Sequence, residues 1–115
     1  FYTRQSGFGV DYRIDTPEEL AAAFKAGHEM GLKSGMLVTN PIPEEFAMPK
    51  SVIDAAIDQA IAECNEKGIK GKETTPFLLA RVAELTGGNS LASNIRLVYN
   101  NAKVAAQTAV HYCNM

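Results

Sequence analysis

Two polar segments hold the side chains best suited to chemistry. Residues 40–46, Asn-Pro-Ile-Pro-Glu-Glu-Phe, follow a short apolar run, and Asn94 lies within a long helical pattern. Glu44 or Glu45 at such a strand end could serve as acid, base or hydrogen-bond acceptor, and an amide could bind a substrate. The alternatives are a rigid turn with solvated glutamates, and an amide bonded to a neighbouring backbone. The candidate pocket residues are therefore Asn94, Asn40, Pro41 and Glu44.

Other reactive side chains have weaker patterns. The lysines could supply an amine for carbonyl chemistry, but none lies in an apolar run of the kind that favours a neutral amine. His28 and His111 have no carboxylate or second histidine at metal-ligand spacing, so we expect no metal site there. Gly87-Gly88 could bind phosphate before a helix, yet no G-x-G-x-x-G or Walker pattern surrounds it, and a helix stop is the better interpretation. Cys64 is expected to be a buried, inert thiol.

Composition limits the classes of function. The chain has 115 residues and a net charge of −2, which argues against a nucleic-acid-binding surface. No apolar run approaches the roughly 18 residues of a membrane span. Two cysteines without a metal-ligand spacing fit a reducing compartment. The first residues, 1–4, lack an initiator methionine and do not resemble a signal peptide, so we interpret the chain as part of a longer polypeptide.

Hydrophobic periodicity predicts the first three elements. Residues 10–14 alternate apolar and polar side chains, as in a half-buried strand. Residues 16–19, Thr-Pro-Glu-Glu, form a capping box with proline at the first helical position, and that helix should end at Gly31. Residues 36–38, Met-Leu-Val, are typical of a strand covered on both faces, and the prolines from Pro41 onward block its continuation.

Three more helices are predicted downstream. The first has a regular apolar stripe and closes at Gly68. Thr75 should cap the second, which ends at Gly87-Gly88 because glycine adopts the left-handed conformation at little cost. Asn89 or Ser90 can cap the last helix. Its expected inward stripe consists of Leu91, Ile95, Val98, Ala102, Ala105 and Ala109.

The predicted fold class is α/β, with few strands and about four helices. Two strands cannot form a well-covered sheet by themselves. A strand such as residues 36–38 needs neighbours on both sides, and we expect them in sequence preceding Phe1. Residues 1–115 are therefore predicted to be one segment of a single larger domain, with the N-terminal half absent from this chain.

Several long motifs resemble one enzyme family. They are FYTR, VDYRIDTPEEL, GMLVTNPIPEEFAMP, TPFLLARVAELTGG, and SLASNI with LVYNNA. Together they run along nearly the whole chain. They resemble the C-terminal part of the pseudouridine-5'-phosphate glycosidase family, also called the indigoidine synthase A-like family. The resemblance implies a three-layer α/β/α fold of which this chain is the C-terminal portion.

The resemblance also implies a reaction. The family cleaves the C–C glycosidic bond of pseudouridine 5'-phosphate reversibly to uracil and ribose 5-phosphate, using a lysine Schiff base and a glutamate proton donor. Its members are commonly homotrimers and need manganese(II). The lysine, the glutamate and the metal site belong to the family's N-terminal half, so we expect no catalytic or metal-binding residue in this chain. The asparagine of the family's SLxSNI motif matches Asn94, which is implied to bind substrate.

Two alternatives stay open. One is a related enzyme that forms C-glycosides in pigment or antibiotic metabolism, and the other is a non-catalytic packing or oligomerisation segment. We expect a small-molecule nucleotide as substrate, with neither a nucleic acid polymer nor a membrane as partner. The expected location is the cytoplasm, or an organelle in a eukaryote, and the segment alone is expected to be inactive.

Overall fold

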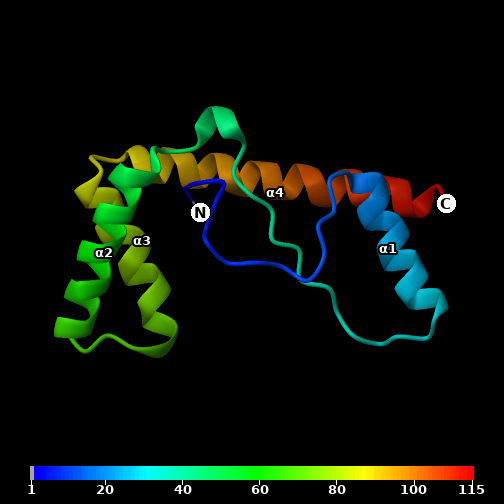
Figure 1. Cartoon of the computed structure of the whole chain (residues 1–115), viewed down its shortest axis with the longest axis horizontal. Helices are drawn as coiled ribbons and strands as arrows, with labels where there is room; N and C mark the ends of the chain where they lie inside the picture. Colours follow the sequence, from blue (N-terminus) through cyan, green and yellow to red (C-terminus); the bar gives the residue numbers. More distant parts are fainter. Residues whose placement is uncertain (1) are drawn as a thin grey trace. The chain divides into compact units, whose positions relative to one another are not determined.

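The computed structural model describes residues 2–115, and within them it is helical. The order is α1 (Pro17–Glu29), the 3-10 turn η1 (Glu44–Phe46), α2 (Lys50–Glu66), the 3-10 turn η2 (Gly71–Glu73), α3 (Thr74–Leu85) and α4 (Asn89–Cys113) (Figure 1). The chain divides into two compact units, one of residues 2–6 with 41–97 and one of residues 7–40 with 98–115. Each unit is described by itself, and α4 belongs to the first as far as Leu97 and to the second beyond it.

The two predicted strands do not form within residues 2–115, so the expectation of an α/β chain is wrong at this point. Residues 10–14 and residues 36–38 are irregular, and their apolar side chains are largely solvent-exposed, with Tyr12 at 86% and Leu37 at 91%. A strand is stabilised by a ladder of hydrogen bonds to a neighbour, and neither segment has one here. The apolar pattern was recognised correctly, but the pairing that would turn it into a strand is missing.

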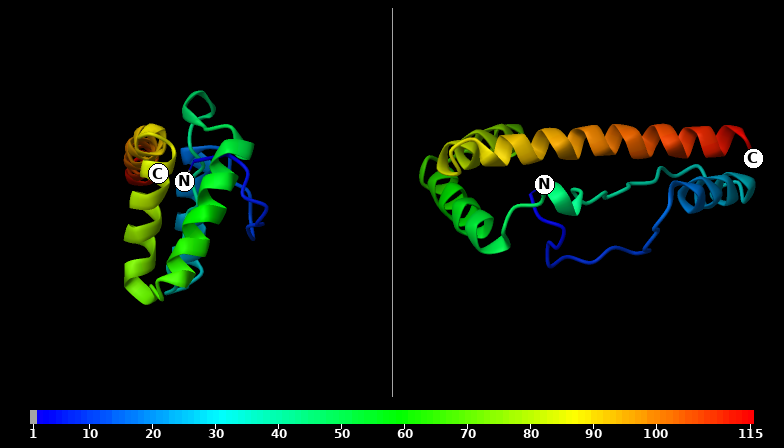
Figure 2. Two further views of the ribbon diagram at one scale, coloured as in Figure 1. Left: turned by 90° about the vertical axis from the view of Figure 1, so that its left-hand side faces the viewer. Right: turned by 90° about the horizontal axis from the view of Figure 1, so that it is seen from above.

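The core of the first unit lies between α2 and α3, which run side by side in every view (Figures 1 and 2). The buried residues are Ile53, Ala56 and Ala60 of α2, Val82 of α3, and Tyr2 from the start of the chain. Small alanines on the facing side of α2 let the helices approach closely, and each fully buried aliphatic side chain contributes about 1.5–3 kcal/mol. The predicted stripe of α2 is confirmed in its centre, and Cys64 is buried as expected.

Glycines end the helices where the sequence indicated. Gly31, Gly68 and Gly87 follow α1, α2 and α3 with positive φ values of 78°, 68° and 63°. The predicted cap of α3 at Thr75 is wrong by two residues, because η2 continues directly into a helix that begins at Thr74, with Glu73 at the N-cap position and no side-chain cap.

Thr86 performs the capping that was assigned to Asn89 or Ser90. Its hydroxyl donates a hydrogen bond to the Val82 carbonyl at 2.8 Å and accepts one from the Ser90 amide at 3.1 Å. Asn89 is already the first helical residue of α4. One side chain therefore closes α3 and opens α4 across the Gly-Gly turn.

The inward face predicted for α4 is also wrong. In the first unit, α4 buries Ser90, Ser93 and Leu97, which are spaced three and four residues apart on one face. The apolar residues Leu91 and Ile95 are instead 54% and 42% exposed. Spacing identified an apolar stripe, but within residues 2–115 the side chains of Leu91 and Ile95 are only partly covered.

The second unit pairs α1 with the C-terminal part of α4. The Thr16 hydroxyl accepts a hydrogen bond from the Glu19 amide at 3.1 Å, which confirms the predicted cap. Leu20 and Ala21 are buried on α1. The rings of Phe24 and Tyr112 then meet edge to face, with centroids 6.0 Å apart. Aromatic and aliphatic contacts therefore hold α1 against α4 within this unit.

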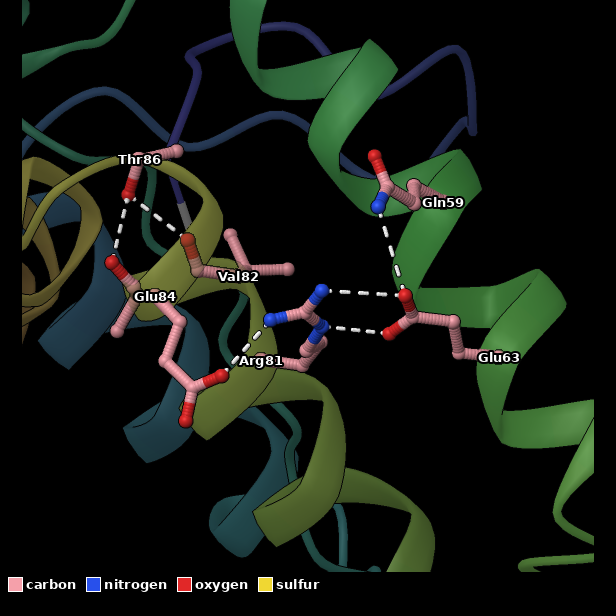
Figure 3. Close-up of polar contacts among 7 residues, drawn as sticks. Gln59, Glu63, Arg81, Val82, Glu84 and Thr86 are labelled. Carbon is pink, nitrogen blue, oxygen red and sulfur yellow. Dashed lines mark hydrogen bonds and ion pairs between the residues drawn. The ribbon is translucent and has the colours of Figure 1, made fainter.

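An ion-pair cluster of Glu63, Arg81 and Glu84, called the clasp below, joins α2 to α3. The guanidinium of Arg81 donates to both carboxylate oxygens of Glu63 on α2, at 2.5 and 3.1 Å, and to Glu84 one turn along α3 at 2.8 Å (Figure 3). The Arg81 and Glu63 side chains are only 29% and 26% exposed. Hydrogen bonding from Arg81 holds the pKa of the Glu63 carboxyl below its ordinary value. This fork geometry is the strongest form of side-chain ion pair.

The lowered pKa of Glu63 gives the clasp a defined pH dependence. Its contribution is complete above the ordinary glutamate pKa, about 4.3, and is lost as the pH falls through the lower folded value. We expect Glu63→Gln to lower the thermal midpoint at pH 7 and to flatten its decline between about pH 5 and 3. The measurement is thermal unfolding by circular dichroism across that range.

The matched control is Asp54→Asn, because Asp54 pairs with Lys50 at 2.9 Å on the exposed side of α2. Exposed pairs of that kind contribute little to stability. Equal effects of the two substitutions on the decline of the thermal midpoint between about pH 5 and 3 would contradict a special role for the clasp.

Candidate functional site

The loop at residues 41–48 is held mainly by groups outside it. Pro41 and Pro43 have no backbone N–H, so the loop can donate few hydrogen bonds of its own. Internally, the Pro43 carbonyl accepts from the Phe46 amide at 2.9 Å, and the Glu44 carbonyl accepts from the Ala47 amide at 3.2 Å, which together form η1. The carbonyls of residues 42 and 46 find donors elsewhere in the first unit.

The start of the chain makes two hydrogen bonds with the loop. The Arg4 Nη1 donates to the Ile42 carbonyl at 2.8 Å, and the Tyr2 carbonyl accepts from the Met48 amide at 2.8 Å. Arg4 and Tyr2 therefore bind the loop near both of its ends. Sequence patterns did not identify either residue as part of a site, although FYTR was among the motifs that carried the family resemblance.

Helix α4 supplies the contacts at the middle of the loop. The Ser93 hydroxyl donates to the Phe46 carbonyl at 2.9 Å, and the Arg96 guanidinium lies 4.9 Å from the centroid of the Phe46 ring. Asn94 follows Ser93 directly, about 100° around the helix, and is half-buried. The first unit thus brings the predicted loop and the predicted asparagine to neighbouring positions.

Tyr2 and Ser90 form a buried polar pair at the start of α4. Burial raises the pKa of the Tyr2 phenol, and the nearby Ser90 hydroxyl offsets part of that rise, although the Ser90 oxygen forms no well-aligned hydrogen bond within residues 2–115. Both side chains are almost fully buried. The phenol therefore stays protonated at neutral pH and acts as a neutral hydrogen-bonding group beneath the first turn of α4.

The other loop residues named from the sequence face solvent. Pro41 and Glu44 are exposed, as is Glu45. The geometry of residues 2–115 assigns no catalytic role to Glu44, and its pocket-lining role stays a prediction.

Asn40 lies in the second unit and has a different partner. Its amide Nδ2 donates to the Asn101 Oδ1 at 3.0 Å. Both amides line a hollow of about 510 Å³ whose other walls are mainly apolar residues of α1, α4 and the segment from Met36 to Val38. Asn40 thus borders a hollow of the second unit, whereas Asn94 belongs to the first unit, and a role for Asn40 in a substrate pocket stays a prediction.

Residues 2–115 contain neither a cluster of metal ligands nor a helix that could span a membrane. No three histidine, cysteine, aspartate or glutamate side chains there gather closely enough to hold a metal ion. Within the same residues, no helix has both the length and the apolar character that crossing a bilayer requires. The described residues therefore do not fit a manganese site.

The chain is similar to known proteins over nearly its whole length. Residues 1–111 match the model of the family described as Indigoidine synthase A like protein. The pseudouridine-5'-phosphate glycosidases of Hahella chejuensis and Clostridium botulinum are 58% and 60% identical over 112 and 110 residues. The alignments cover 97% and 96% of this chain but only 37% and 36% of those relatives. The chain therefore spans little more than a third of their length.

Two solved structures share the fold of the chain. An indigoidine synthase A-like protein from Thermotoga maritima has a TM-score of 0.76 and 36% identity, over 96% of this chain and 36% of its own. The prealnumycin C-glycosynthase, solved in complex with ribulose 5-phosphate, has a TM-score of 0.77 and 28% identity with the same coverage.

Proposed function

The chain belongs to the indigoidine synthase A-like family, and from this premise we propose that it forms the C-terminal part of a pseudouridine-5'-phosphate glycosidase. The complete protein would cleave the C–C glycosidic bond of pseudouridine 5'-phosphate to uracil and ribose 5-phosphate in the cytoplasm. The observation that carries the proposal is the identity of 56–60% to glycosidases from three bacteria across nearly all of this chain.

The chain would supply a pocket wall rather than the reacting groups. The lysine and glutamate of the proposed reaction would come from the part of the protein outside this chain. Asn94 would bind the substrate through its amide, which can donate two hydrogen bonds and accept two. Its support is its half-buried position beside the loop that Ser93 and Arg96 contact.

A second candidate function is the formation of a C-glycosidic bond. The similarity to the prealnumycin C-glycosynthase, at 28% identity, favours it. The higher identity to the glycosidases makes bond cleavage the stronger proposal. A third candidate is a non-catalytic packing or oligomerisation segment. The exposed apolar stripe of α4 favours it, and in the first proposal the same stripe would pack within a homotrimer.

Activity of the complete protein tests the first proposal. We expect it to release uracil from pseudouridine 5'-phosphate, and we expect Asn94→Ala to raise KM about tenfold, the effect of losing one or two substrate hydrogen bonds. Uracil release followed by chromatography is the measurement. Asn65→Ala, on the exposed end of α2, is the matched control. A folded protein that turns over only other base and sugar-phosphate pairs would favour the C-glycoside-forming alternative.

Manganese dependence is part of the proposal. The ion would be bound by residues outside this chain, since residues 2–115 offer no cluster of ligands. We expect chelation followed by dialysis to abolish turnover of the complete protein, and added manganese(II) to restore it. Hydrogen exchange in α2 and α3 should not change on chelation, and a large change there would contradict a site elsewhere.

The segment from Met36 to Asn40 would become a strand in the complete protein. Met36, Val38 and Asn40 line the hollow of the second unit, whereas Leu37 between them is almost fully exposed, which is the two-residue alternation of an extended chain. Within residues 2–115, no backbone-to-backbone hydrogen bond involves residues 33–40. Their donors and acceptors are therefore available to a neighbouring strand from the rest of the protein.

Hydrogen exchange tests this pairing. The amides of residues 37–39 should exchange at least about tenfold more slowly in the complete protein than in the 115-residue chain alone, because ladder hydrogen bonds protect them. The amides at the centre of α2 serve as the internal reference. Equally fast exchange of residues 37–39 in both proteins would rule the strand out.

A further inference from the structure

We propose that Arg4 is a positioning residue, which fixes the loop at residues 41–48 against α4 beside the amide of Asn94. Its direct partner is the Ile42 carbonyl, at 2.8 Å from Nη1. The inference rests on the proposed function, since it assumes that Asn94 binds substrate. Arg4 itself touches no reacting atom and acts through the backbone of the loop.

The loop needs such a contact because it cannot organise itself. Two of its first three residues are prolines, and its only regular structure is the three-residue turn Glu44–Phe46. A carbonyl that loses its partner in a partly buried position costs free energy. The Ile42 carbonyl has its partner 38 residues away in the sequence, and the Ile42 side chain is only 1% exposed. Because the Ile42 side chain is buried, the bond that holds its carbonyl also helps to hold this side chain in place.

Three contacts together define the position of the loop. Arg4 binds at Ile42, Ser93 at the Phe46 carbonyl, and Tyr2 at the Met48 amide. The Ser93 contact comes from the residue directly before Asn94. The Arg4 and Ser93 contacts therefore hold the loop at two points, and the second of these points lies on α4 directly before Asn94.

Arg4 differs from Arg13 and Arg81 in the kind of group that its guanidinium binds. Arg81 and Arg13 both bind carboxylates. Among the described residues, no ion pair joins Arg4 to an acidic side chain, and its recorded hydrogen bond goes to a neutral backbone carbonyl. A charged donor makes a stronger hydrogen bond than a neutral one, so the Arg4 guanidinium is well suited to holding the Ile42 carbonyl.

The test is steady-state kinetics of the complete protein with pseudouridine 5'-phosphate. Arg4→Met should raise KM about tenfold and leave kcat within about twofold, because the loop loosens while the reacting groups outside this chain are untouched. Arg4→Lys should recover most of the affinity, since an ammonium can still donate to the carbonyl. Arg13→Met is the matched control, because Arg13 pairs with Asp15 on the surface, and it should leave KM unchanged.

A merely structural Arg4 would give a different result. It would lower the thermal midpoint and the fraction of active enzyme, and so reduce apparent kcat, without a selective change in KM. If Arg4→Met does not fold, Ser93→Ala removes the second contact to the same loop and should raise KM in the same way. An unchanged KM in folded Arg4→Met, with Asn94→Ala impaired, would overturn the inference and leave the proposed function intact.

Hydrogen exchange keeps the two proposals separable if the complete protein does not cleave pseudouridine 5'-phosphate. In Arg4→Met the amides of Ala47 and Met48 should exchange at least about fivefold faster than in the unmodified protein, whatever the reaction is. Faster exchange would support the positioning role although the proposed function had failed. Unchanged exchange would overturn the positioning role independently of any activity.

Discussion

The first unit depends on the burial of one tyrosine near the start of the chain. The Tyr2 ring completes the core between α2 and α3, its phenol lies beside Ser90 at the start of α4, and its carbonyl accepts from Met48. One residue thus contacts both helices of the hairpin, the last helix and the end of the proline loop. It also brings Arg4, two residues later, within reach of Ile42. Without this anchor, the loop at residues 41–48 would keep its contacts with Ser93 and Arg96 of α4.

Local signals in the sequence predicted the helices well, because helix ends depend on nearby residues. Thr16 caps α1, and Gly31, Gly68 and Gly87 mark three helix ends as expected. The strands failed for the opposite reason, since a strand exists only with a partner, and within residues 2–115 neither residues 10–14 nor residues 36–38 pair with one. The inward face of α4 failed similarly. An apolar stripe shows which side of a helix avoids water, but not whether the covering surface belongs to the same chain.

The candidate site was only partly predictable. The proline loop and Asn94 could be chosen from residue type and spacing, and the family resemblance gave Asn94 its proposed role. Arg4 and Ser93 could not, because their contacts to the loop join residues 38 and 47 positions apart, and no local pattern encodes such a pairing. The bond between Asn40 and Asn101 likewise joins residues 61 positions apart. Long-range hydrogen bonds to backbone carbonyls are invisible in a single sequence.

The hydroxyl of Thr86 has a consequence for how this region tolerates sequence change. It bonds a carbonyl at the end of α3 and an amide at the start of α4. Valine would fill the same volume and would satisfy a hydrophobic packing criterion, but it would leave the Ser90 amide without its partner, whereas the Val82 carbonyl would keep its bond from the Thr86 amide at 3.0 Å. Serine keeps both bonds at the expense of one methyl group. At position 86, which precedes the helix carrying Asn94, the hydrogen-bonding capacity of the side chain therefore limits substitution more tightly than its volume does.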